Sequence, residues 1–142
     1  MNIQTKFFGN IEIDENKVIK FEDGIPGFED LKKFLFMTDE DANSPFCWLQ
    51  SIEDVNIVFT LINIFKFIPD YNPNVDMEIL SKLGKIEEEN LAIYCIANIP
   101  KNIKDMTVNL KAPIIINLFN NNAKQIICNN DDYSIKYYVY KN

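Results

Sequence analysis

The stretch Val108-Asn109-Leu110-Lys111-Ala112-Pro113-Ile114-Ile115-Ile116-Asn117 decides the fold of this chain. Its second half is rich in β-branched residues and Pro113 would break a helix, so it predicts a strand. Residues 114–118 are apolar except for one asparagine, which predicts a strand buried on both faces. Residues 107–110 alternate polar and apolar, which is typical of a half-exposed strand. Because proline cannot donate to a sheet ladder, we expect a bend at Pro113 that leads from a wet surface into the core.

On both sides of this stretch, short β-rich segments recur between turn residues, and they predict about nine strands in all. The other expected strands are residues 3–8, 11–13, 18–21, 34–37, 46–51, 57–62, 91–97 and 125–128, with a last strand or a mobile tail at 136–140. Tight turns separate the first three strands and predict a meander. One two-turn helix is expected over residues 77–83, with Asp76 as N-cap and Gly84 after its end. We therefore predict an all-β, mainly antiparallel fold: a small closed or partly open β-barrel with one short helix, with a sandwich as the alternative.

A second unusual stretch is Gly24-Ile25-Pro26-Gly27-Phe28. Two glycines flank Ile25 and Pro26, which indicates that the backbone needs a positive φ or a close approach at one of them. Phe28 is expected to return into the core. The stretch therefore predicts a shaped loop that closes one end of the barrel.

Charge and composition exclude several classes of function. The 142 residues are long enough for one buried core, so residues 1–142 are expected to form a single domain. The net charge is −7, and the basic residues are all lysines because the chain contains neither arginine nor histidine. Without histidine there is no ordinary general base near neutral pH, and without arginine there is no bidentate clamp for phosphate or guanine. Direct binding to nucleic acid is not expected, because an acidic surface repels the phosphate backbone.

The sequence also indicates where the protein acts and what it does not hold. No apolar run is long enough to span a bilayer and no signal peptide is recognisable at the N-terminus, so we expect a cytoplasmic protein without a membrane partner. Cys47, Cys95 and Cys128 are widely spaced and are expected to be free, buried thiols. Acidic runs at 39–41, 87–89 and 131–132 fall in expected loops and suit attraction of a basic protein better than catalysis. Calcium binding by residues 129–132 is an alternative, but the EF-hand spacing is absent, so no metal or cofactor is expected.

Three motifs carry a resemblance to a known family. They are Gly-Ile-Pro-Gly-Phe-Glu at residues 24–29, Ser-Pro-Phe at 44–46 with Leu-Gln-Ser at 49–51, and residues 109–117 followed by Gln125. In this order and spacing they resemble the bacterial flagellar assembly factor FliW family over nearly the whole chain. One departure is Asn63-Ile64-Phe65, where the family usually has Asn-Pro, and the segment beyond Tyr133 also diverges.

The resemblance implies a small β-barrel that is not an enzyme. It implies that the protein binds cytoplasmic flagellin and, through a protein–protein contact, antagonises the translational repressor CsrA. Flagellin that accumulates would occupy the factor and release CsrA, which couples flagellin translation to export. The alternative is a flagellin-specific export chaperone without a regulatory role. A small-molecule-binding barrel or a hydrolase is a further class, which the missing histidine and arginine disfavour.

Residues that contact a partner are predicted around the proline bend and the glycine-bracketed loop. Flagellin is expected to place an amphipathic terminal helix in an apolar groove near the bend, with Leu110 and Phe28 as anchors. The predicted partner-binding residues are Ile25, Pro26, Phe28, Leu110, Lys111, Ala112, Pro113 and Ile114.

Overall fold

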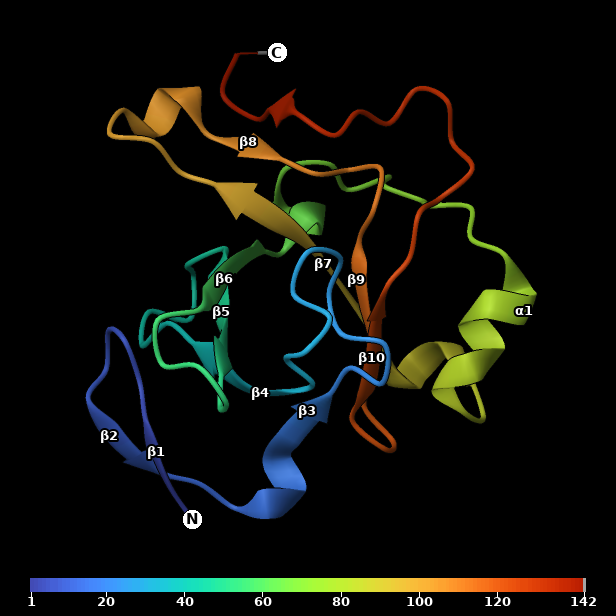
Figure 1. Cartoon of the computed structure of the whole chain (residues 1–142). Helices are drawn as coiled ribbons and strands as arrows, with labels where there is room; N and C mark the ends of the chain where they lie inside the picture. Colours follow the sequence, from blue (N-terminus) through green and yellow to red (C-terminus); the bar gives the residue numbers. More distant parts are fainter. Residues whose placement is uncertain (142) are drawn as a thin grey trace.

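A closed barrel forms the body of the protein (Figure 1). The computed structural model describes residues 1–141 of the chain. Seven strands make the ring in the order β3-β4-β5-β6-β7-β9-β10. Their bounds are Val18–Lys20, Lys33–Thr38, Phe46–Ser51, Val58–Ile62, Leu91–Asn98, Ile114–Asn117 and Asn122–Gln125, in that order. The ring closes through a parallel contact between β3 and β10. All other pairs of neighbouring strands in the ring are antiparallel. The predicted all-β, mainly antiparallel barrel is confirmed.

The longest strand, β7, belongs to the barrel along only part of its length. Its first half pairs with β9, and its second half pairs with β6 and then with β8 (Thr107–Val108). The short strand β11 (Tyr137–Tyr138) adds to the outer side of β8. Strand β11 therefore covers Thr107 and Val108, which are buried. The expectation of a half-exposed, wet strand here is therefore wrong, because the C-terminal segment returns over it.

The N-terminal hairpin lies outside the barrel. It consists of β1 (Asn2–Gln4) and β2 (Asn10–Glu12), which form their own two-stranded sheet. A 3₁₀ turn, η1 (Glu15–Lys17), then redirects the chain, so β3 pairs with β4 and β10 and the predicted meander of three strands is wrong. The hairpin is held on the barrel where Lys6 N donates to the buried Gln50 Oε1 at 2.9 Å.

Strand β9 is buried on both faces, as the isoleucine run predicts. Ile114 and Ile116 belong to the cluster inside the barrel, while Ile115 packs outside it against Leu80 and Leu83. Those two leucines come from α1 (Met77–Leu80) and the 3₁₀ turn η3 (Ser81–Leu83), which lie beside β10 in Figure 1. The short helix and the turn after it therefore bury the outer face of β9, and this packing in turn stabilises the helix.

The predicted ends of this helix are confirmed. The Asp76 carboxylate accepts a hydrogen bond from Glu78 N at 2.8 Å, and Gly84 follows the last turn with a φ of +95°. Three further 3₁₀ turns are η2 (Ile64–Lys66), η4 (Glu88–Asn90) and η5 (Ile103–Asp105). Strand β10 begins earlier than the expected strand at 125–128, although the chain beyond it stays extended because Cys128 N still donates to Lys111 O at 2.8 Å.

The glycine-bracketed loop between β3 and β4, residues 21–32, closes one end of the barrel. In Figure 1 it lies within the ring of strands. We call it the plug loop. Gly24 has a φ of +68° and Gly27 a φ of +88°, as the sequence predicts for a shaped loop. Ile25 is the residue that fills the barrel end, whereas Phe28 is 38% exposed and packs edge-on against Phe59 with ring centroids 5.1 Å apart.

Candidate partner-binding site

The other end of the barrel is hollowed by two adjoining pockets of about 620 and about 430 Å³. Phe36 on β4 and Tyr94 on β7 line both pockets, and their ring centroids lie 5.3 Å apart. The remaining lining comes from residues 14–19, 36–47, 63–66 and 116–121. We call the two pockets together the mouth groove. It is a continuous depression because the same aromatic pair forms part of the wall of both.

One wall of the mouth groove is the tip of the β9–β10 hairpin, residues 118–121. Asn117 is fully buried, and its Nδ2 donates to Leu83 O and to Lys85 O, both at 3.0 Å. Its Oδ1 accepts from Phe119 N at 3.1 Å. Asn120 adds a bond from its Nδ2 to Leu83 O at 2.8 Å. Buried amides that meet several partners hold a loop in one conformation, so this tip is fixed to the turn that follows α1.

The far side of the same tip is also fixed. Asn121 adopts a φ of +61°, a conformation that asparagine tolerates better than most residues, and its Nδ2 donates to Asn16 O at 2.7 Å. Leu118 N donates to Asn90 O at 2.8 Å. This well-anchored turn nevertheless presents apolar side chains to solvent, since Leu118 is 55% and Phe119 76% exposed. A rigid turn that exposes a leucine and a phenylalanine is typical of a surface that meets another molecule.

The charged residues around the mouth groove are mainly acidic. Asp14 lines the larger pocket, and Asp39, Glu40 and Asp41 line the smaller one. Within residues 1–141, no lysine lies within ion-pair distance of these four carboxylates. Lys17 and Lys66 also line the groove.

One of these two lysines is already engaged. Lys66 Nζ donates to the backbone oxygens of Asn43 and Ser44, at 3.2 and 3.4 Å. Three of the carboxylates likewise accept backbone N–H groups, namely Asp14, Asp39 and Asp41. With four carboxylates and two lysines in its lining, the groove has a net negative charge, and it favours a cationic ligand.

Burial raises the pKa of two groups beside the groove. The pKa of Tyr94 lies above its usual value, mainly because burial disfavours the charged phenolate and also because Cys47 is nearby. Burial raises the pKa of Cys47 to about 12. Within the described chain the Tyr94 hydroxyl has no hydrogen-bond partner, so it can donate to or accept from a ligand. Both groups are therefore neutral at physiological pH.

Two further features bear on metal binding. No group of three or more histidine, cysteine, aspartate or glutamate side chains among residues 1–141 is arranged to hold a metal ion. In the asparagine-rich turn at residues 129–132, Asn130 has a structural role: its Oδ1 accepts a hydrogen bond from Asn74 N at 2.6 Å, and its Nδ2 donates to Asn72 O at 3.2 Å. Over the same residues, none of the helices has the length and apolar content that crossing a membrane requires.

The partner-binding residues predicted from the sequence lie around the plug loop and the proline bend, away from the mouth groove. Five of them are buried, namely Ile25, Leu110, Ala112, Pro113 and Ile114. Pro26 and Phe28 are exposed and Lys111 is partly exposed. Leu110 is fixed from within the core, since its carbonyl oxygen accepts a hydrogen bond from the Tyr71 hydroxyl at 2.7 Å. A contact by these eight residues stays a prediction, and the side chains that a partner can reach are those of Pro26, Phe28 and Lys111.

Sequence reasoning did not find the mouth groove. Phe36 and Tyr94 sit within expected strands, where aromatic residues are usually core. One signal was present: Leu118 and Phe119 directly precede the turn Asn120-Asn121-Asn122, so two large apolar residues stand at the end of a hairpin.

Taken together, the structure is that of a small closed β-barrel protein with one end plugged and a groove at the other. The FliW protein family matches residues 2–139. The flagellar assembly factor FliW of Thermoanaerobacter pseudethanolicus is 49% identical over 137 residues, which is 96% of this chain and 91% of the relative. That of Alkaliphilus metalliredigens is 41% identical over 139 residues, 98% of this chain and 86% of the relative. This chain belongs to the FliW family.

The barrel itself is shared with a solved structure. A crystal structure of a flagellar assembly factor FliW superposes with a TM-score of 0.91 at 36% sequence identity, covering 100% of this chain and 99% of that one. The resemblance drawn from the three motifs is therefore confirmed, for the family and for the fold.

Proposed function

We propose that this protein is a non-enzymatic, cytoplasmic flagellar assembly factor that binds flagellin and antagonises the translational repressor CsrA by protein–protein contact. Membership of the FliW family carries the proposal. The relatives that align with nearly the whole chain are named flagellar assembly factors. In this scheme, one molecule of the factor binds either flagellin or CsrA. Flagellin that has not been exported removes the factor from CsrA, and repression of flagellin translation follows.

The chemistry of the surface supports a protein partner that is basic. The chain has a net charge of −7 and no arginine, so it is poorly suited to bind RNA itself. An RNA-binding protein carries positive charge where it meets phosphates, and an acidic factor attracts such a protein over several ångströms in solution. Capture of the repressor, rather than competition for its RNA by mimicry of bases, is the mode that this composition favours.

For flagellin, we propose contact at the face formed by the plug loop and the proline bend. Pro26 and Phe28 supply exposed apolar surface there, and Phe28 is held from behind by Phe59. Two buried members of the predicted set, Ile25 and Ile114, share the core cluster that supports the loop. A fixed loop that exposes a proline and a phenylalanine suits the apolar face of an amphipathic helix.

Calorimetric titration tests the proposal. The protein is titrated with purified flagellin and with CsrA, separately and then in competition. Binding to both, with flagellin displacing CsrA, is the expected result. Binding to flagellin alone would identify an export chaperone without a regulatory role, and binding to neither would refute the proposed function. A Phe28→Ser variant is expected to bind flagellin at least tenfold more weakly, and its circular dichroism and unfolding midpoint check that the barrel is intact.

A further inference from the structure

We propose that the mouth groove is a docking site for a basic amphipathic segment of a partner protein. The segment places a large apolar side chain against Phe36, Tyr94 and Phe119, and its lysines or arginines lie against the acidic rim. The inference extends the proposed function by giving the basic partner a site, and it rests on that function only in requiring a protein partner. Because the face proposed for flagellin lies at the other end of the barrel, displacement of CsrA by flagellin then requires the bodies of the two partners to overlap beyond these contacts.

The first observation that carries it is the apolar part of the groove. Phe36 and Tyr94 are half-buried rather than buried, since both pack against the cluster inside the barrel and line the end that the plug loop does not fill. Ile19 and Ile116 complete the wall of the larger pocket. A volume of about 620 Å³ exceeds that of any one side chain, so the pocket accommodates an aromatic or branched residue with part of its backbone.

The second observation is that the hairpin tip is preorganised. Three asparagines fix its backbone through side-chain hydrogen bonds to η1 and to the turn after α1. Phe119 is 76% exposed, yet it borders the groove. An aromatic residue on a fixed turn loses little conformational freedom on binding, which is the property of side chains that dominate the affinity of an interface.

Charge complementarity selects the partner. Asp14, Asp39, Glu40 and Asp41 line the groove without ion pairs within the described residues. The Tyr94 hydroxyl adds an uncharged acceptor on the wall of the groove. An acidic or neutral segment would leave these carboxylates unpaired beside it, whereas a basic segment pairs them, so the occupant is cationic.

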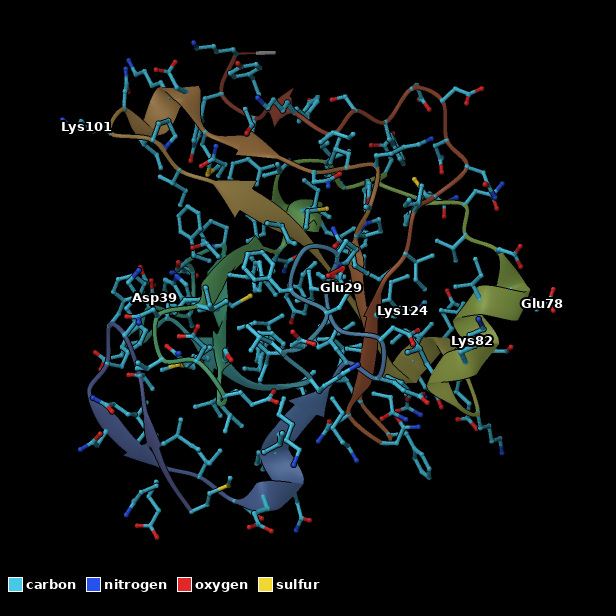
Figure 2. All side chains as sticks on the ribbon, in the orientation of Figure 1. Glu29, Asp39, Glu78, Lys82, Lys101 and Lys124 are labelled. Carbon is cyan, nitrogen blue, oxygen red and sulfur yellow. The ribbon has the colours of Figure 1, made fainter. Side chains whose placement is uncertain are left out.

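Two variants with matched controls test the site. Phe119→Ser removes the apolar contact, and Phe7→Ser is its control because Phe7 is 62% exposed on the separate N-terminal hairpin. A triple variant, Asp39→Asn with Glu40→Gln and Asp41→Asn, removes the acidic rim. Its control, Glu78→Gln with Asp131→Asn and Asp132→Asn, removes equal charge elsewhere. Figure 2 shows Asp39 and Glu78 on opposite sides of the molecule.

Two probes are titrated by fluorescence anisotropy: labelled CsrA, and a synthetic 14-residue peptide with lysines on one helical face and leucines on the other. Phe119→Ser is expected to raise the dissociation constant of both at least tenfold, whereas Phe7→Ser leaves it within twofold. The acidic-rim variant is expected to weaken binding and to flatten its dependence on salt, and the charge control is not. Unfolding midpoints of all variants are measured alongside.

The outcomes separate this inference from the proposed function. If CsrA binds all groove variants as tightly as it binds the parent protein, the site is wrong and the proposed function stands. If CsrA does not bind the parent protein, the proposed function fails and the peptide decides the site. One-to-one, Phe119-dependent binding of the peptide then supports the groove, and binding that is absent or indifferent to Phe119 overturns it.

Discussion

The α-carbon of Gly24 approaches the backbone of Glu29 so closely that a β-carbon on Gly24 would lie 2.5 Å from Glu29 Cα. Across this contact the plug loop folds back on itself, and it directs Ile25 into the barrel end. Gly24 also has a φ of +68°, where L-residues are strained. The position therefore requires glycine for two independent reasons.

We expect Gly24→Ala to lower the free energy of unfolding by about 3 kcal/mol, since the cost of a positive φ and the cost of overpacking add. Gly27→Ala in the same loop is the control. Its φ is also positive, at +88°, but nothing lies within 4 Å of an added β-carbon, so it is expected to cost about 1 kcal/mol. Urea unfolding measures both, and equal losses for the two variants would contradict the role of the close approach.

A second prediction concerns the anchor of the hairpin tip. Asn117→Ala leaves Lys85 O without its side-chain donor and Phe119 N without its acceptor, and it is expected to cost about 2 kcal/mol of stability. The amide of Phe119 should exchange its hydrogen faster in this variant. Asn122→Ala is the control, because among the described residues its side chain forms no hydrogen bond, and a change below about 0.5 kcal/mol is expected. An unchanged exchange rate at Phe119 in Asn117→Ala would show that the tip is held by other contacts.

Local sequence was sufficient to predict the elements whose conformation depends on neighbouring residues in the chain. The isoleucine run of β9, the Asp76 cap and the plug-loop glycines are of this kind, since each rests on side-chain burial, one hydrogen bond or a positive φ. Closure of the barrel is different. The parallel contact pairs Lys20 with Asn122, about a hundred positions apart in the chain, and no local pattern encodes such a pairing.

The mouth groove was hidden for the same reason. Phe36 and Tyr94 are aromatic residues within strands, as core residues usually are, and they stay partly exposed because they lie at the end of the barrel that the plug loop does not fill. Thr107 and Val108 show the reverse effect: their alternation indicates an exposed face, and β11, which is distant in sequence, buries them. At both places exposure is decided by segments that are distant in sequence.

The three thiols provide a third prediction, because Cys47, Cys95 and Cys128 are all buried. Burial raises the pKa of Cys47 and of Cys95 to about 12. At pH 8 their thiolate fraction is then smaller by about a thousandfold than that of a free cysteine, so a thiol reagent is expected to react very slowly with the native protein. In urea all three thiols should react at once. Rapid labelling of a native thiol would show that the barrel opens locally at that residue.

The ion pair between Lys124 and Asp23 gives a pH-dependent prediction. Lys124 Nζ lies 2.6 Å from Asp23 Oδ2, and this hydrogen bond is the main reason why the pKa of Asp23 lies below its ordinary value. A carboxyl group whose pKa is depressed by folding stabilises the protein above the unfolded pKa, near 4, and that contribution disappears as the pH falls through the lower folded pKa. The Asp23 side chain is 66% exposed, so solvent screening limits the effect to below about 1 kcal/mol.

Asp23→Asn is therefore expected to lower the unfolding free energy slightly at pH 7 and to match the parent protein near pH 2. The measurement is urea unfolding of both proteins across this range at low ionic strength, repeated in 1 M salt, where the difference at pH 7 should shrink. Lys85 and Glu87 form a more exposed ion pair at 3.6 Å, and Glu87→Gln is the control that should change stability less. A penalty for Asp23→Asn that persists undiminished at pH 2 would mean that the side chain acts through packing rather than through its charge.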